Sequence, residues 1–159
     1  MASSEPVFLD AGLFIGALMG ADLRHPEARP LVEAARRGEW MACTSVGVLA
    51  EVFAALTWVG AQPSQSAEAA AWAVRLLVEE PSRLHVLDTT WPAGLKMLQL
   101  AERHQLTARR IHDARHAATA LTAGVYRVYT YDPEDWRVFE PDGMIIAGPP
   151  SVLTSSPSR

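Results

Sequence analysis

Cysteine is almost absent from this chain of 159 residues, and Cys43 is the only one. No disulfide can form within the chain, which excludes the disulfide frameworks of small secreted domains and is consistent with a reducing compartment. Cys43 stands in the apolar run at residues 40–43, which favours a buried thiol that acts as a small hydrophobic group.

The chain also lacks a basic charge balance, and its formal net charge is −4. Nucleic-acid-binding domains are usually basic, so charge alone does not favour such a role. Lysine is nearly absent as well, with Lys96 the only one among 14 basic side chains. No apolar run reaches the roughly 18 residues that span a membrane, and the first residues lack the basic charge of a signal peptide. We therefore expect a cytoplasmic protein with no membrane segment.

What the chain does contain is a large apolar fraction, 49%, with 20% charged residues, which is typical of a packed globular core. Short apolar or β-branched runs alternate with segments of helical periodicity. This alternation predicts an α/β sandwich around a mostly parallel sheet. The expected strands are about 7–9, 40–44, 84–87, 125–131 and an edge strand at 144–146, and the expected helices are about 13–19, 26–37, 45–59, 68–80, 92–106 and 111–123.

No internal repeat or linker divides the sequence. We expect a single domain over residues 1–147, and a disordered tail over the Pro- and Ser-rich residues 148–159.

Four carboxylates stand out by their positions. Asp10 ends the first expected strand and Asp132 follows the fourth, where an open parallel sheet forms its functional crevice. Glu51 interrupts an apolar helix, and Asp113 lies in the first turn of another. Each alone is explained equally well as a cap, a turn or a solvated residue. Together they suggest a cation site, because clustered carboxylates repel one another unless a cation lies between them, and oxygen ligands suit Mg²⁺ or Mn²⁺.

Four segments, in this order, resemble the motifs of PIN-domain ribonucleases over about residues 6–140. They are the strand ending in Asp10, the helix start at residues 44–52, residues 113–120 and residues 130–136. The chain is similar to the VapC-type toxins of bacterial VapBC toxin–antitoxin pairs. The resemblance implies a PIN-like three-layer α/β/α sandwich. One position departs from the family, which often has Asn two residues after the first Asp, where this chain has Gly12.

The resemblance implies a Mg²⁺-dependent endoribonuclease, with Mn²⁺ as an alternative ion, that hydrolyses phosphodiester bonds in single-stranded RNA and leaves 5′-phosphates. Which acid is the general base stays open, as does the number of ions. The implied catalytic and metal-binding residues are Asp10, Glu51, Asp113 and Asp132, the accessory residues are Asp135, Thr130 and Ser45, and the arginines expected to contact RNA are Arg109, Arg110 and Arg115, with Arg24 also flanking the motifs.

The resemblance also implies two protein partners, a second copy of the chain and a VapB-like antitoxin. The middle helices carry Trp58, Trp72, Leu76 and Leu77, more large apolar residues than one side of a small core needs, and exposed apolar area often marks an interface.

Other functional classes fit less well. Asp88 ends the third expected strand, where a receiver-like signalling domain has its phospho-acceptor. That class needs paired acids after the first strand and a lysine after the last, and Lys96 is elsewhere. A haloacid-dehalogenase-like phosphatase needs an Asp at position 12. His112 and His116 have no partners at zinc-ligand spacing, so we expect packing or surface roles for them. A PIN scaffold that only binds a partner remains the main alternative.

Overall fold

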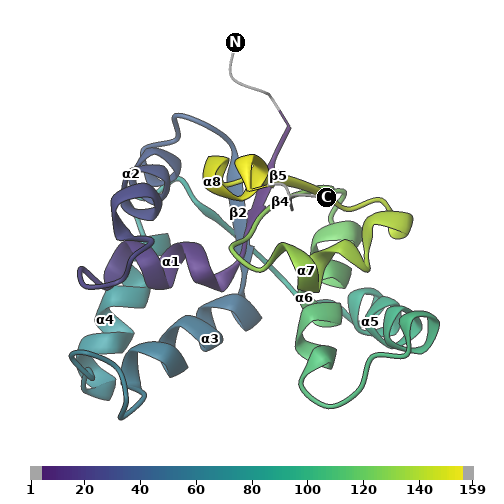
Figure 1. Ribbon diagram of the computed structural model, residues 1–159, viewed down its shortest axis with the longest axis horizontal. Coiled ribbons are helices and arrows are strands. Elements are labelled where there is room, and N and C mark those ends of the chain that lie inside the picture. The colour runs from purple at the N-terminus through teal and green to yellow at the C-terminus, as the bar shows by residue number, and fades with distance from the viewer. Residues whose placement is uncertain (1–4, 156–159) are drawn as a thin grey trace.

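The computed structural model describes residues 5–155 and contains one sheet of five parallel strands (Figure 1). The strand order is β3-β2-β1-β4-β5, with every neighbouring pair parallel. The predicted α/β class and parallel sheet are confirmed. The strands are β1 (Val7–Leu9), β2 (Ala42–Ser45), β3 (His85–Leu87), β4 (Arg127–Tyr129) and β5 (Ile145–Gly148).

Helices flank this sheet, and in the view of Figure 1 α1 to α4 lie to the left of the strands while α5 to α7 lie to the right. Ser45, Ser66 and Thr90 cap α3, α4 and α5 through their side-chain oxygens, which explains where these helices begin. The helices are α1 (Ala11–Leu18), α2 (His25–Arg36), α3 (Val46–Thr57), α4 (Ala67–Val78), α5 (Trp91–His104), α6 (Arg110–Thr122), α7 (Pro133–Arg137), the 3₁₀ helix η1 (Glu140–Asp142) and α8 (Pro150–Thr154).

The central strand β1 is buried along its whole length, and Phe8 packs against the rings of Trp136 and His116. From β1 the chain proceeds outward to β2 and β3, then crosses back so that β4 pairs with the other side of β1. The carboxyl ends of β1 and β4 therefore form the topological switch point, where open α/β sheets bind their ligands.

The C-terminal segment differs from the sequence-based expectation. Residues 148–155 do not form a disordered tail, because α8 follows β5 and is tied to α2. Glu27 accepts hydrogen bonds from the Ser151 backbone N–H at 3.0 Å and from the Ser151 hydroxyl at 2.6 Å. The remaining part of the predicted tail, 156–159, lies outside the described residues. Within residues 5–155, no helix is long and apolar enough to cross a membrane.

Candidate metal centre

Asp10 lies at the switch point, directly after β1, and caps α1. One carboxylate oxygen accepts a hydrogen bond from the Ala11 N–H at 2.9 Å. The other accepts from the Thr130 hydroxyl at 2.8 Å and from the Trp136 indole N–H at 3.0 Å. Only 8% of Asp10 is exposed. Three donors therefore fix the orientation of this carboxylate before any ligand binds.

Thr130 couples the ends of β1 and β4. Its hydroxyl, which is fully buried, donates to Asp10 and accepts from the Asp132 backbone N–H at 3.0 Å. The loop that holds Asp132 is thereby held against Asp10, so one side chain sets the relative position of two candidate ligands. Thr130, which the sequence indicated as an accessory residue, lies next to Asp10 in the structure.

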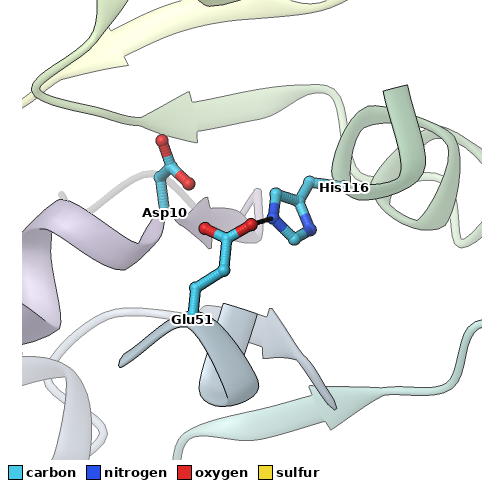
Figure 2. A group of neighbouring side chains, drawn as sticks. All are labelled: Asp10, Glu51 and His116. Atoms are coloured by element: carbon cyan, nitrogen blue, oxygen red, sulfur yellow. Dashed lines mark hydrogen bonds and ion pairs between the residues drawn. The ribbon is translucent and has the colours of Figure 1, made fainter. Parts of the chain in front are cut away.

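Glu51 reaches the same place from α3, and His116 reaches it from α6 (Figure 2). His116 Nε2 donates to Glu51 Oε1 at 2.7 Å, and the imidazole is 1% exposed. Ligand atoms of Asp10, Glu51 and His116 all lie within 4.8 Å of one another. Of the packing or surface role expected for His116, the structure agrees with packing, because the imidazole is buried and lies against the Phe8 ring. Its hydrogen bond to Glu51 was not predicted. The signal in the sequence was its place three residues after Asp113, on the same face of a helix.

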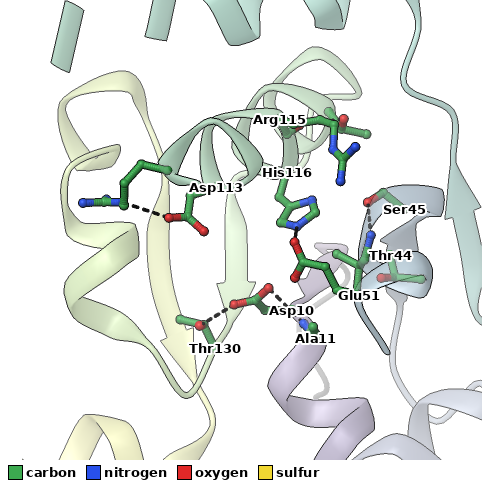
Figure 3. Close-up of polar contacts among 12 residues, drawn as sticks. Asp10, Ala11, Thr44, Ser45, Glu51, Asp113, Arg115, His116 and Thr130 are labelled. Carbon is green, nitrogen blue, oxygen red and sulfur yellow. Dashed lines mark hydrogen bonds and ion pairs between the residues drawn. The ribbon is translucent and has the colours of Figure 1, made fainter. Parts of the chain in front are cut away.

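Asp113 and Asp132 complete the acidic group. Figure 3 shows Asp113 on α6, on the same side of the site as Asp10 and Glu51. Asp113 lies in the first turn of α6, where it accepts a hydrogen bond from Arg110 Nε at 2.9 Å. Together with Asp10, Glu51 and Asp135 they line one pocket of about 190 Å³. The structure thus brings together all the acids proposed from the sequence.

The electrostatics of the pocket are those of crowded like charges. Burial raises the pKa of Asp113 above its usual range, and the neighbouring charges of Asp135 and Asp10 add to this effect against the opposing hydrogen bond from Arg110. Burial likewise raises the pKa of Asp132, followed by the charges of Asp10 and Asp135. Carboxyl groups in such a setting bind a proton or a cation readily.

Glu51 differs from the other two acids. Burial tends to raise its pKa, but the hydrogen bond and charge of His116, with the charges of Arg115 and His112, lower it to a greater extent. The net pKa of Glu51 is therefore below its usual range, and this carboxylate is held in the charged form that binds a metal ion.

The sequence also indicated Ser45 and the arginines at the start of α6 as site residues, and these side chains have different surroundings in the structure. Ser45 is buried and accepts the Val48 N–H at 3.2 Å, so its hydroxyl is used as the cap of α3. Arg110 is paired with Asp113, whereas Arg109 is exposed at the start of α6. The Arg115 guanidinium packs over Gly47, where a Cβ would lie 2.8 Å from Nη2.

The donor set is dominated by carboxylate oxygens, which suit a hard divalent cation with several waters, as Mg²⁺ and Mn²⁺ prefer. The raised pKa values of Asp113 and Asp132 support the same fit, since burial and the charges of Asp10 and Asp135 disfavour their ionised forms and a bound cation would offset this. The ligand atoms that lie close enough together to share one ion belong to Asp10, Glu51 and His116. Asp113, Asp132 and Asp135 line the same pocket.

An apolar groove leads up to the acidic pocket. It is lined by α1, the following loop and the end of α3, and includes Met19, Ala54 and Trp58. Ile15 and Arg24 line both the groove and the acidic pocket, so the two adjoin. Of the apolar residues singled out in the sequence, Trp58, Trp72 and Leu76 are about half exposed or more, whereas Leu77 is buried in the core.

Comparison with known proteins gives a consistent result. The sequence model described as the PIN domain matches residues 7–138. A comparison with curated protein sequences finds no match.

Solved structures similar to this chain show the same fold at low identity. The Mycobacterium tuberculosis toxin VapC20, described as cleaving the sarcin–ricin loop, is 20% identical with a TM-score of 0.67, and the match covers 90% of this chain and 99% of that one. The Rickettsia felis VapBC2 complex bound to promoter DNA is 17% identical with a TM-score of 0.60, and the match covers 89% of this chain and 97% of that one. VapBC-1 of nontypeable Haemophilus influenzae is 20% identical with a TM-score of 0.58, and the match covers 86% of this chain and 93% of that one.

Proposed function

The chain belongs to the PIN-domain family, and from this premise we propose that it is a Mg²⁺-dependent endoribonuclease that hydrolyses single-stranded RNA. We propose further that it is the toxin of a type II toxin–antitoxin pair. The catalytic domain would be single and span residues 1–147, with α8 packed onto it.

One observation supports this proposal most strongly. Acidic side chains from four separate segments converge in one small pocket at the switch point of the sheet: Asp10 after β1, Glu51 on α3, Asp113 on α6 and Asp132 after β4. A scaffold that only binds a partner has no need of this convergence, since packing carboxylates together costs stability.

The chemistry follows from the donor set. When bound, a divalent ion neutralises charge on the phosphate and stabilises the charge that develops in the transition state. Asp10, Glu51, Asp113 and Asp132 would hold it, with Mn²⁺ as an alternative to Mg²⁺. Thr130 and the Trp136 indole hold Asp10 in position, and one of the carboxylates would accept the proton of the attacking water.

RNA would approach along the start of α6. Arg109 is exposed there, Arg110 lies at the rim of the acidic pocket, and Arg115 follows on the same helix. Contacts of arginine to phosphate hold and orient an RNA strand without reading its bases.

The decisive experiment is cleavage of a labelled single-stranded RNA by the purified protein, with Mg²⁺ and then with EDTA. Cleavage that requires Mg²⁺ and disappears in Asp10→Asn supports the proposal. A wild-type protein that binds Mn²⁺ but cleaves no RNA, in the presence of an intact fold, would favour the binding scaffold instead.

The groove beside the pocket supports a proposal about the antitoxin. Its apolar lining suits an extended or helical segment of a VapB-like partner, and Ile15 is where such a segment would reach the acids. An arginine on that segment would suit the carboxylates, because its planar fork matches a carboxylate pair. We also propose that the chain forms a homodimer through exposed apolar residues such as Trp72 and Leu76.

A further inference from the structure

Arg24 is a cation held rigidly beside the acidic pocket. Its Nε and Nη2 donate to the two carboxylate oxygens of Asp22 at 2.9 and 2.7 Å. The guanidinium carbon lies 5.5 Å from the centre of the Tyr131 ring, within the range of a cation–π contact. Tyr131 in turn donates to Glu27 at 2.8 Å. Arg24 therefore loses little conformational freedom when it binds a ligand.

The Nη1 end of this guanidinium lies against α1, the helix that begins after Asp10. Both hydrogen bonds to Asp22 use Nε and Nη2, whereas Nη1 lies against Gly12, next to Asp10. Arg24 lines the same pocket as Asp10 and Asp132, and its side chain is 32% exposed. Two N–H donors are thus presented at the edge of the pocket, on the side of α1.

Gly12 leaves room for Nη1 because it has no side chain. A Cβ at position 12 would lie 3.0 Å from Nη1 and 3.4 Å from the Tyr131 ring, a tight contact that requires the guanidinium to shift by a few tenths of an ångström. A larger side chain at position 12 and the guanidinium from the α1–α2 loop would compete for the same space.

An RNA phosphate that enters a pocket lined by carboxylates meets repulsion wherever a metal ion does not offset it. A fixed guanidinium at the wall offsets that repulsion and donates hydrogen bonds to an anionic oxygen in a defined direction. We propose that Arg24 is a phosphate-binding residue of this chain, that Nη1 donates to a non-bridging oxygen of the RNA backbone next to the scissile bond, and that Gly12 is required for that contact. This inference rests on the proposed ribonuclease function.

The first test measures RNA binding without cleavage. A fluorescent single-stranded RNA is titrated with protein in EDTA over a series of NaCl concentrations. Arg24→Ala should weaken binding about tenfold, as expected for one charge-assisted hydrogen bond. It should also reduce the slope of log K against log salt by roughly 0.7, as expected for one fewer phosphate contact to a single strand.

The matched control is Arg37→Ala, because Arg37 is likewise paired with an acid two residues away, Glu39, but lies before β2 at the opposite end of the strands. This variant removes the same charge and should change RNA affinity less than about twofold. Equal losses in the two variants would show a general charge effect and overturn the inference.

The second test is a double-mutant cycle with Gly12→Ala. In the wild type this substitution crowds Nη1, which must shift by a few tenths of an ångström, and it should weaken RNA binding by less than Arg24→Ala does. In the Arg24→Ala background it should cost nothing further, because the side chain it displaces is gone. Thermal melts of each variant check the fold. If Arg24→Ala unfolds the protein, the Gly12→Ala variant alone still decides: unchanged RNA affinity overturns the inference.

Arg24 has one other plausible role, a counter-ion that only balances the acids. Arg24→Ala would then bind Mn²⁺ more tightly than the wild type does and would bind RNA equally well, and that pair of results overturns the inference.

The outcomes also separate the inference from the proposed function. Wild-type protein that binds RNA through Arg24 but never cleaves it would overturn the ribonuclease and leave the phosphate contact standing. Cleavage with unchanged RNA binding in Arg24→Ala would overturn the phosphate contact alone, and wild-type protein that neither binds RNA nor cleaves it with Mg²⁺ would overturn both.

Discussion

Among the single residues, Asp113 best separates function from stability. Its carboxyl group is crowded by Asp135 and Asp10, so charge at this position is unfavourable in the metal-free protein. Asp113→Asn removes that charge while keeping the shape of the side chain. We expect RNA cleavage to fall by about 100-fold or more, as for the loss of a group that stabilises transition-state charge, while the melting temperature of the metal-free protein does not fall.

The control for this variant is Asp88→Asn, which neutralises an exposed acid at the end of β3. It should leave cleavage unchanged. A strong decrease in the melting temperature of Asp113→Asn would show instead that its ion pair with Arg110 is structural.

The raised pKa values of Asp113 and Asp132 also predict a pH dependence of stability. The folded, metal-free protein holds protons on these groups more tightly than the unfolded chain does, so their contribution is fully present below the ordinary pKa of 3.8 and is lost as the pH rises through the raised values. The double variant Asp113→Asn/Asp132→Asn has no such groups to deprotonate, so it does not lose this stability. The difference between its free energy of unfolding and that of the wild type, both measured with urea, should therefore become more favourable to the variant as the pH rises from 3.8 to neutrality.

Other acids, including Glu51, have lowered pKa values and act in the opposite sense. They are present in both proteins, so their effect largely cancels in the difference. A difference that is constant over this pH range would contradict the crowding of the two carboxylates.

Between elements, the contact of α3 with α6 passes through Glu51 and His116. Groups that orient a ligand of a metal ion commonly change its affinity by 10–100-fold when removed. We expect His116→Ala to weaken Mn²⁺ binding by about tenfold or more, measured by calorimetry in the absence of RNA. His112→Ala is the control, because His112 lies one turn earlier on α6 but is exposed. Equal Mn²⁺ affinity in both variants would mean that His116 only packs.

The elements themselves were largely predictable, because the local signals that set them are short in range. Ser45 marks the start of α3 through its capping oxygen, and each expected strand has a counterpart in the sheet. The short helices α7 and α8 were not predicted, since five residues are too few for a helical period to show. The expected strand at 125–131 is shorter in the structure, where pairing with β1 covers Arg127–Tyr129.

The site was predictable as far as topology determines it. Asp10 and Asp132 follow strands that parallel pairing brings side by side, so their proximity follows from the fold class. The contact of His116 with Glu51 depends on how α6 packs against α3. The position of the Arg24 guanidinium depends on the space left by Gly12. Neither feature has a local signature, because each arises from residues far apart in the chain.

At the scale of the whole molecule, the groove and the acidic pocket form one continuous surface through Ile15 and Arg24. If an antitoxin places an arginine among the acids, it competes with Mg²⁺ for the same carboxylates. Inhibition of RNA cleavage by the antitoxin should then weaken as Mg²⁺ rises. Salt screening alone acts in the same direction, so NaCl at matched ionic strength is the control. Equal relief by both salts would contradict competition and favour a blocked RNA path.

The hydrogen bonds of Asp10 span most of the chain, since Thr130 and Trp136 lie 120 and 126 residues further on. A ribosome makes Asp10 early and these two donors late. Until they have emerged, the nascent polypeptide has β1 without its neighbour β4, and Asp10 keeps only the Ala11 N–H of its three donors. The acids therefore cannot adopt their final arrangement until the segment that carries Thr130 and Trp136 has emerged from the ribosome.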